Sequence, residues 1–183
     1  MNVAIIGASG YTGLELIKIL INHPKFNIVY IANSSGEMNV QDLHPCLKNV
    51  INMDVSLANA SQVAKVADLA FLALPHKTAM SFAKELLDLG VKVIDLSADY
   101  RLELETYEKH YCEHLDKEHI KDAVYGLPEY FKEDIKTAKL IANPGCYPTA
   151  SLLALLPFID YIDIDAPIFI DAKSGVSGAG KNP

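Results

Sequence analysis

Three glycines near the N-terminus, Gly7, Gly10 and Gly13, stand three residues apart. An apolar run precedes them and helical spacing follows, which is the setting in which a glycine loop binds the diphosphate of a dinucleotide. The first glycine would allow a tight turn, the second a close approach of the diphosphate, and the third close packing of the helix on the sheet. A turn that serves only the strand–helix junction is the alternative, and the βαβ pattern behind the loop disfavours it. The predicted contacts are Gly7, Ser9, Gly10, Tyr11, Thr12 and Gly13.

The end of the second predicted strand bears on which dinucleotide would bind. An NAD-preferring site usually carries Asp or Glu about 20 residues past the glycine loop, where the carboxylate binds the ribose 2′-hydroxyl. Here the strand runs into Asn33, Ser34 and Ser35, without an acid. A neutral loop with hydroxyl groups tolerates a 2′-phosphate that a carboxylate would repel. We therefore predict NADP, with Ser34, Ser35 and backbone N–H groups as phosphate contacts.

Cys146 lies in the segment Asn143–Thr149 (NPGCYPT), between a predicted strand and a predicted helix. Pro148 suits a first helical turn, so the sulfur would lie at a helix N-terminus, where the helix field favours the thiolate. A thiolate beside a nicotinamide can take an acyl group as a thioester, which hydride then reduces to an aldehyde. The alternative is an inert buried thiol. Cys46 and Cys112 lack this setting and are expected to be structural.

Alternating apolar runs and helical patterns must position these residues. Near-continuous apolar runs predict strands that are buried on both faces. Their alternation with helices predicts an α/β fold with a doubly wound (Rossmann) parallel sheet. The predicted strands are Val3–Ile6, Ile28–Ala32, a weaker one at Val50–Val55, Asp68–Leu74, Val91–Leu96, Lys139–Ala142 and Ala166–Ala172. The predicted helices are Leu14–Ile21, Thr78–Leu89 and Pro148–Phe158.

Two further segments bear on domain organisation. Leu102–Ile135 is polar and rich in Tyr, His, Glu and Lys, so we expect an insertion between strands of the sheet. We place a domain boundary near Cys146, with an NADP-binding Rossmann domain over 1–147 and the beginning of an α+β substrate and dimerisation domain over 148–183. The glycine-rich segment Ser174–Pro183 leaves a predicted strand with nothing after it, and we therefore expect a truncated product.

Composition and charge exclude several classes of protein. The 183 residues are 50% hydrophobic and 21% charged, with a net charge of -7 and interspersed signs, which argues against nucleic acid or an anionic membrane as a partner. No apolar run reaches the roughly 18 residues of a membrane helix, and the N-terminus has no signal-peptide pattern. Three separated cysteines without an export signal indicate reduced thiols. We expect a cytoplasmic protein that acts on a small molecule.

The motifs as a set resemble the N-acetyl-gamma-glutamyl-phosphate reductase family. The resemblance runs the whole length of the chain, and the combination of DLSADYRL with NPGCYPT makes it specific, whereas either glycine motif alone would not. The matching motifs are GASGYTG (7–13), LPH (74–76), DLSADYRL (95–102), YGLPE (125–129), NPGCYPT (143–149) and SGVSGAG (174–180).

This resemblance implies an enzyme of arginine biosynthesis that uses NADPH to reduce an N-acetylglutamyl acyl phosphate to the semialdehyde, with release of phosphate. Cys146 matches the family's nucleophile. The family's nucleotide contacts fall on Gly7–Gly13, Ser34 and the loop at Pro75. These assignments agree with the chemistry that the glycine loop and the cysteine suggest by themselves.

Other implied contacts lie later in the chain. The loop that closes over the nicotinamide falls on Ser174 and Gly175. Arg101 is a candidate for binding the substrate's carboxylate or phosphate, which a guanidinium suits; a surface salt bridge is the equally open alternative. Asn143 is expected at the substrate as well.

The chain departs from the family in length. Members are considerably longer, and their general acid/base histidine lies in the C-terminal part that is missing here. We therefore expect the chain to bind NADP and to carry the nucleophile without full activity, and we expect the intact enzyme to be a homo-oligomer. None of the six histidines matches the missing one: His23, His44, His76, His110, His114 and His119.

Three other functions compete with this interpretation. An extended short-chain dehydrogenase shares the glycine spacing but needs a Tyr with a Lys four residues on, which none of the nine tyrosines has. Aspartate-semialdehyde dehydrogenase shares the thioester chemistry, and only the flanking motifs disfavour it. A non-catalytic NADP-binding module stays open.

A metal site is not expected. His110 and His114 would share a helix face, and His119 follows nearby. Cys112, however, would point elsewhere, and no fourth ligand is fixed. A charged helix face accounts for the segment better.

Overall fold

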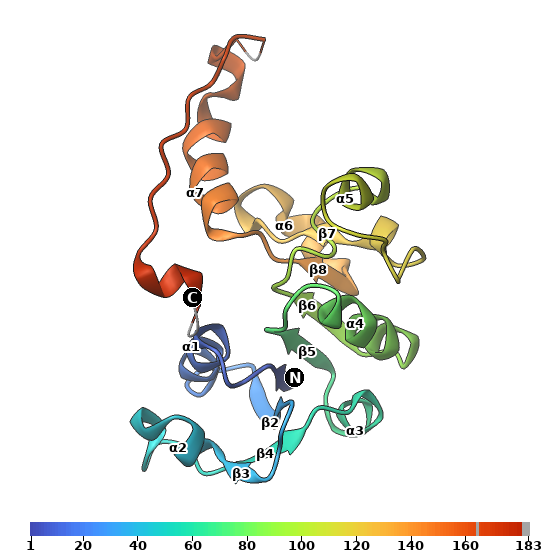
Figure 1. Cartoon of the computed structure of the whole chain (residues 1–183), viewed down its shortest axis with the longest axis vertical. Coiled ribbons are helices and arrows are strands. Elements are labelled where there is room, and N and C mark those ends of the chain that lie inside the picture. Colours follow the sequence, from blue (N-terminus) through green and yellow to red (C-terminus); the bar gives the residue numbers. More distant parts are fainter. Residues whose placement is uncertain (164, 181–183) are drawn as a thin grey trace.

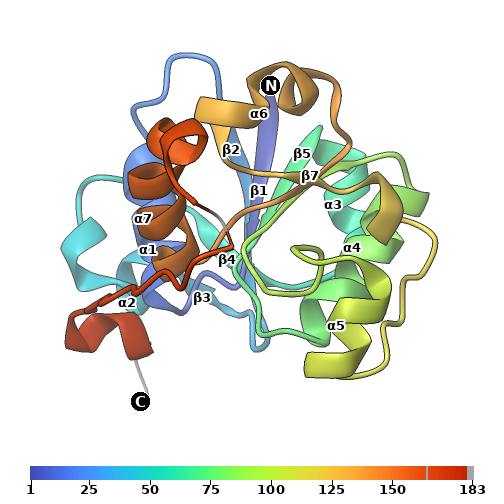
Figure 2. The ribbon, with the colours of Figure 1, turned by 90° about the horizontal axis from the view of Figure 1, so that it is seen from above.

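The computed structural model describes residues 1–163 and 165–180, which form a mostly parallel sheet with helices on both faces (Figures 1 and 2). The strand order is β3-β4-β2-β1-β5-β6-β8-β7, and only the pair β3–β4 is antiparallel in this sheet of the described chain. The predicted doubly wound α/β sheet is confirmed. The strands are β1 Asn2–Ile6, β2 Asn27–Asn33, β3 Met38–Asn39, β4 Asp54–Leu57, β5 Leu69–Leu72, β6 Lys92–Asp95, β7 Val124–Tyr125 and β8 Leu140–Ala142.

Helices make the crossovers between the parallel strands. The α-helices are α1 Tyr11–Leu20, α2 Val40–Leu43, α3 Ala60–Val66, α4 Thr78–Asp88, α5 Leu104–His110, α6 Pro128–Thr137 and α7 Cys146–Leu155. Short 3-10 helices are η1 Pro45–Leu47, η2 Ile120–Asp122, η3 Leu156–Tyr161 and η4 Val176–Ala179.

Strand β1 runs through the middle of the sheet and is buried on both faces. Successive side chains of a strand alternate between faces. Val3 and Ile5 therefore join the core beneath α1 and α2, whereas Ala4 and Ile6 join the core beneath α3 and α4. Each fully buried Val or Ile contributes roughly 1.5–3 kcal/mol through removal of apolar surface from water. This double burial is why the strand reads as one apolar run.

Helix α4 shows how local sequence sets the bounds of an element. Its buried side chains follow helical spacing and pack on the sheet: Ala79, Met80, Ala83 and Leu86. The helix ends at Asp88 with Leu89 as its C-cap, and the next residue, Gly90, adopts φ 82°. There the Val91 N–H donates to Leu86 O at 2.9 Å and the Gly90 N–H to Leu87 O at 2.9 Å, a Schellman motif that only glycine accommodates without strain.

The predicted insertion, Leu102–Ile135, lies between β6 and β8. It contains α5, η2, β7 and most of α6, and its buried side chains include Tyr107, Ile120 and Leu127. Strand β7 pairs in parallel with β8 and forms one edge of the sheet. The insertion therefore extends the sheet by a strand that is too short to give a sequence pattern.

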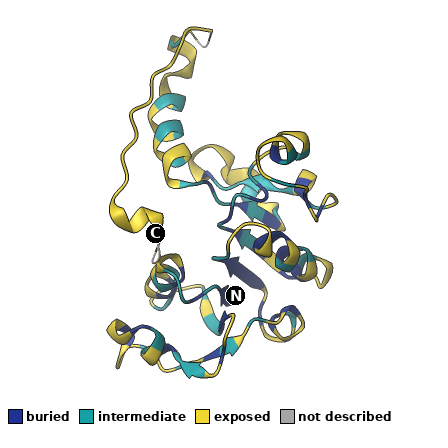
Figure 3. Cartoon of the chain, viewed as in Figure 1, coloured by how far each residue is buried: buried dark blue, intermediate teal, exposed yellow. Residues whose placement is uncertain are grey.

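The chain after β8 is built differently from the rest (Figures 1 and 3). Helix α7 projects from the sheet, and the segment after it runs back toward the side that carries α1. No described residue from 146 onward is buried. Helix α7 begins at Cys146, two residues before the predicted start, and η3 continues it to Tyr161.

Two strand predictions are corrected by the structure. The prediction of a strand at Ala166–Ala172 is wrong: this segment is not paired with any described strand, and Phe169 is 95% exposed. An apolar run alone does not make a strand, because its N–H and C=O groups need a neighbouring strand. The strand expected at Val50–Val55 lies instead at Asp54–Leu57, since the N–H groups of Val50 and Ile51 donate locally to Leu47 O.

None of the helices in the described ranges has both the length and the apolar character needed to span a membrane.

Candidate functional site

The predicted site residues of the sheet domain lie in loops at one edge of the sheet. In a doubly wound sheet, ligands bind outside the carboxyl ends of the parallel strands. Gly7 follows β1, Ser34 follows β2, Pro75 follows β5, Arg101 follows β6 and Asn143 follows β8. The fold therefore brings together residues that the sequence separates by more than 130 positions.

The three glycines of the first loop differ in whether a larger residue would fit at their positions. Gly7 has φ 92°, and a Cβ there would lie 2.2 Å from Ala73 O, just after β5. A Cβ on Gly13 would lie 2.6 Å from Gly7 O, where α1 passes close to the loop. At Gly10, by contrast, nothing in the described chain lies within 4 Å of a Cβ position. The outer glycines are required by the fold, and Gly10 leaves open space into which a ligand can come.

Helix α1 begins at the open end of this loop. Its N-cap is Gly10, and the structure shows no side-chain cap there from any described residue. The N–H groups of the first turn therefore remain for an anion, which the helix dipole favours as well. Ser9 is half-buried, while Tyr11 and Thr12 are exposed. This cradle fits the diphosphate of a dinucleotide.

The loop after β2 presents Ser34 and Ser35 to solvent. Buried Asn33 shapes it: its Oδ1 accepts from the Ser35 N–H at 2.8 Å and the Gly36 N–H at 2.6 Å. These two N–H groups are thus already bonded within the loop. The two serine hydroxyls are the groups that this loop offers to a 2′-phosphate.

Cys146 is exposed and is the first residue of α7. The N-cap of this helix is also a glycine, Gly145, and it also lacks a side-chain cap from the described residues. The turn is held from outside, because the Asn143 N–H donates to Asp95 O at 2.8 Å. Pro148 lies in the first turn, where its missing N–H costs nothing. The sulfur therefore stands at an open helix N-terminus.

Arg101 braces the turn that carries Cys146. Its Nε donates to Asn143 O at 2.8 Å, and its Nη2 donates to Leu96 O at 2.7 Å. Its Nη1 lies 3.1 Å from the position that a Cβ on Gly145 would occupy. No ion pair of Arg101 occurs within the described residues, so the salt-bridge alternative has no partner there. The Asn143 side chain bonds locally, from Nδ2 to Pro144 O at 3.0 Å.

A cavity of about 530 Å³ opens beside the cysteine. Ser174 and Cys146 both line it, and Gly175 follows Ser174 as the N-cap of η4. The complete lining is Cys146, Tyr147, Ala150, Ser151 and Ala154 of α7 together with Ile170, Asp171, Ala172, Lys173 and Ser174.

Sequence reasoning did not single out Asp99, which closes the start of α4. Its buried carboxylate accepts from the Lys77 N–H and the Met80 N–H, both at 3.0 Å, and from Tyr107 OH at 2.7 Å. Lys77 is the helix N-cap and adopts φ 70°. No spacing rule links a carboxylate to amides 22 and 19 residues earlier, so the sequence carries no signal for this contact.

A second buried carboxylate, Asp95, ends β6. Burial raises its pKa to about 6, and hydrogen bonds from the Ser97 N–H (3.1 Å) and Ser97 Oγ (2.6 Å) oppose that shift. Together Asp95 and Asp99 give the loop after β6 its fixed path. That path delivers Arg101 to the turn of Cys146.

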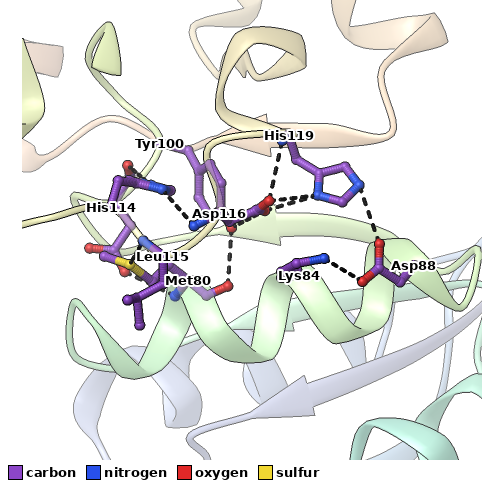
Figure 4. A network of polar contacts seen from close by, with 9 residues as sticks. Met80, Lys84, Asp88, Tyr100, His114, Leu115, Asp116 and His119 are labelled. Atoms are coloured by element: carbon purple, nitrogen blue, oxygen red, sulfur yellow. Dashed lines mark hydrogen bonds and ion pairs between the residues drawn. The ribbon is translucent and has the colours of Figure 1, made fainter. Parts of the chain in front are cut away.

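Further polar contacts hold this loop against the insertion (Figure 4). Tyr100 OH donates to Asp116 Oδ2 at 2.8 Å, and burial raises the pKa of the phenol. His114 Nδ1 accepts from the Asp116 N–H at 3.0 Å, so its Nε2 carries the proton that it donates to Asp99 O at 2.9 Å. Asp116 also contacts His119 Nδ1 at 2.8 Å. His114 and His119 thus stabilise the packing of the loop after β6 against the insertion.

The side chains around His110 and His114 do not form a metal-binding geometry in the described parts of the chain. No group of three or more His, Cys, Asp or Glu side chains there could hold a metal ion. His110 is exposed, whereas His114 is buried with both ring nitrogens bonded.

Comparison with known proteins identifies the family. A family model described as "Semialdehyde dehydrogenase, NAD binding domain" matches residues 2–138, three quarters of the chain. The chain belongs to the semialdehyde dehydrogenase family. A second model of the same family, described as the dimerisation domain, matches residues 146–183.

Similar proteins within the semialdehyde dehydrogenase family carry one name. The chain is 60% identical over 181 residues to a protein named N-acetyl-gamma-glutamyl-phosphate reductase from Sulfurovum sp. (strain NBC37-1), covering 99% of this chain and 54% of that protein. It is also 60% identical over 179 residues to the protein of that name from Wolinella succinogenes, covering 98% and 53%. The chain thus spans about half the length of these relatives.

Solved structures of semialdehyde dehydrogenases share the fold at low identity. Aspartate semialdehyde dehydrogenase with NADP from Candida albicans has a TM-score of 0.64 at 19% identity, covering 87% of this chain and 47% of that one. Aspartate semialdehyde dehydrogenase II complexed with ASA from Vibrio cholerae has a TM-score of 0.61 at 21% identity, covering 87% and 46%. The likeness concerns the fold.

Proposed function

We propose that this chain is the nucleotide-binding and nucleophile-bearing part of an NADP-dependent N-acetyl-gamma-glutamyl-phosphate reductase. The observation that carries the proposal is that two open, glycine-led helix starts lie at the same edge of the sheet. One, at Gly10, can hold a diphosphate, and the other, at Gly145, presents the exposed sulfur of Cys146. The name shared by relatives at 60% identity supports the choice of substrate.

In this proposal Cys146 attacks the acyl carbon of the acyl phosphate. A carbon–sulfur bond forms, and the carbon–oxygen bond to phosphate breaks, with its electron pair leaving on phosphate. The result is a thioester on Cys146. The positive end of the α7 dipole would stabilise the negative charge that the sulfur carries in the attack, and again when the sulfur leaves.

NADPH, when bound, supplies the hydride that converts the thioester to the aldehyde. Gly10 would leave room for its diphosphate, Gly7 and Gly13 keep the turn and the start of α1 in place around that space, and the first-turn N–H groups of α1 would bind the anion. Ser34 and Ser35 take the 2′-phosphate, and Pro75 and the Ser174–Gly175 turn flank the nicotinamide end. Each of these groups orients the cofactor, and none takes part in bond making.

Arg101 and Asn143 are proposed at the substrate's anionic groups. Two donors of Arg101 are used on Asn143 O and Leu96 O, which fixes the plane of the guanidinium. The hydrogens on Nη1, beside Gly145, are then directed at the turn of Cys146, where a phosphate would leave. A preorganised donor of this kind costs no rearrangement when the reaction occurs.

Three broader properties complete the proposal. The match of residues 146–183 to a dimerisation domain supports a homo-oligomer. We further propose a cytoplasmic location, consistent with three free cysteines, two of them exposed. The domain boundary is proposed near 147/148, where the buried sheet domain gives way to the exposed helix α7.

Phosphate-dependent oxidation of semialdehydes by NADP tests the proposal in the full-length protein. We expect oxidation of N-acetylglutamate semialdehyde and at most a trace with aspartate semialdehyde. Preference for aspartate semialdehyde would favour the sister enzyme. NADP binding without oxidation of either aldehyde would favour a non-catalytic module.

A further inference from the structure

His44 is a buried histidine that the proposed chemistry does not use. It lies between α2 and η1, is 6% exposed, and its Nε2 is 2.6 Å from Ala8 O in the glycine loop. The backbone of His44 is fixed on both sides, because its N–H donates to Val40 O at 2.9 Å and its carbonyl accepts from the Leu47 N–H at 2.8 Å. The ring therefore reaches the loop from a rigid support.

The contact has a defined direction. A carbonyl oxygen only accepts, so His44 Nε2 carries the hydrogen and donates it to Ala8 O. On the other side, the Ala8 N–H donates to Ala32 O at 3.0 Å. Both polar groups of Ala8 are thus bonded to parts of the chain outside the loop. The peptide bond from Ala8 to Ser9 cannot turn over without breaking the bond to His44.

The orientation of that peptide matters for an anion. In a trans peptide the carbonyl oxygen and the following N–H point in opposite directions, so the Ser9 N–H points away from His44. Within the described chain this N–H has no hydrogen-bond acceptor. A turned peptide would place the Ala8 oxygen, an acceptor with partial negative charge, where the N–H now lies.

We propose that His44 is a positioning residue for the cofactor diphosphate: by holding Ala8 O, it keeps the Ser9 N–H directed into the cradle at the start of α1. This inference rests on the proposed NADP site. It assigns to His44 an effect on the diphosphate alone, because the adenosine and its 2′-phosphate would contact the loop after β2. The affinity for a ligand without a diphosphate should therefore not depend on the His44 side chain.

Calorimetric titration of the 183-residue chain with two ligands tests the proposal. NADP contains the diphosphate, and adenosine 2′-monophosphate does not. His44→Leu removes the donor, and we expect its dissociation constant for NADP to rise about tenfold, the size of one hydrogen bond to a charged group. Its dissociation constant for adenosine 2′-monophosphate should equal that of wild type.

Two further variants separate the donor from the shape of the side chain. His44→Gln places an amide N–H near the position of Nε2, and we expect NADP affinity within about threefold of wild type. His110→Leu removes an exposed histidine of α5 and should change neither ligand's affinity. The proposal is overturned if the Leu variant binds NADP like wild type, if it loses both ligands equally, or if the Gln variant is as weak as the Leu variant.

A wild-type measurement keeps the test independent of variant folding. Nitrogen chemical shifts of the His44 ring report which nitrogen carries the hydrogen, and we expect Nε2. A hydrogen on Nδ1 alone would contradict the bond to Ala8 O. Failure of the wild-type chain to bind NADP would overturn the proposed function together with this inference, whereas NADP binding unaffected by His44→Leu would overturn the inference alone.

Discussion

Helices α1, α4 and α7 begin at the same edge of the sheet, and they begin in two different ways. α1 and α7 each follow a glycine, Gly10 and Gly145, with no side-chain cap from the described residues. α4 follows Lys77, and the buried carboxylate of Asp99 takes its Lys77 and Met80 N–H groups. The helices thus differ in whether the protein itself satisfies their first N–H groups.

The two kinds of helix start suit two different purposes, anion binding and stabilisation of the fold. A helix start that is closed by a buried carboxylate gains stability and loses the ability to bind an anion. A start that is left open forgoes that stability and keeps its N–H groups for a ligand or a thiolate. On this account the molecule closes α4 for the fold and leaves α1 and α7 open for the cofactor and the nucleophile.

The largest expected effect is at the open start of α7. In the full-length protein, Cys146→Ser should lower the rate of phosphate-dependent aldehyde oxidation by about 1,000-fold or more, because a hydroxyl is a far weaker nucleophile than a thiolate. Cys46→Ser, at an exposed cysteine of η1, is the matched control and should keep the wild-type rate. Equal rates for wild type and Cys146→Ser would show that Cys146 at the start of α7 is not the nucleophile.

The next effect concerns a glycine that the fold requires. Gly7→Ala places a Cβ on Ala73 O at a positive φ, and we expect the free energy of unfolding to fall by about 3–6 kcal/mol. Gly90→Ala has a similar φ but no described atom within 4 Å of the Cβ, so it should cost only about 1–2 kcal/mol. Urea unfolding measures both, and equal losses would show that the contact with β5 is unimportant.

The closed start of α4 can be opened by Asp99→Asn. The amide keeps only part of the acceptor capacity for two N–H groups and a hydroxyl, and we expect a loss of about 3–5 kcal/mol in the free energy of unfolding. Asp88→Asn, in an exposed ion pair with Lys84, should cost at most about 1 kcal/mol. A stability of Asp99→Asn within 1 kcal/mol of wild type would contradict the distinction between closed and open starts.

The smallest effect is a pH dependence at Asp95. Burial raises the folded-state pKa to about 6 from an ordinary value of 3.8, so the folded state binds the proton more tightly than the unfolded state does. Measured against Asp95→Asn, the wild-type chain should be most stable below about pH 4 and should lose up to about 3 kcal/mol as the pH rises to about 6, with no further loss above that. A difference that grows more favourable to wild type with rising pH would contradict the sign.

The features that could be predicted from the sequence are those that depend on residues close together in the chain. The turn at Gly7 and the sharp end of α4 near Gly90 depend on local backbone requirements, although α1 begins at Tyr11, three residues before the predicted start at Leu14. The burial of β1 on both faces appears directly as an apolar run. The exposed cysteine at a helix start was likewise visible in the segment 143–149, although the helix begins two residues earlier than predicted.

The features that were not predictable depend on contacts between distant segments. Asp99 caps a helix that begins more than 20 residues earlier, Arg101 bonds a carbonyl 42 residues later, and His44 holds a carbonyl 36 residues earlier. No periodicity records such pairings. The strand prediction at Ala166–Ala172 was wrong for a related reason. Its apolar side chains indicate a strand, but a strand also needs a neighbouring strand to pair with, and the sequence of the segment does not show whether one is present.

The central claim, that the open start of α1 holds the cofactor, is tested most directly at Gly10. Since no described atom lies within 4 Å of a Cβ there and its φ is −80°, Gly10→Ala should change the free energy of unfolding by at most about 1 kcal/mol. The added methyl group would occupy the cradle, and calorimetric titration should show the dissociation constant for NADP raised at least about tenfold. A Gly10→Ala chain that melts like wild type and binds NADP as tightly would contradict the account.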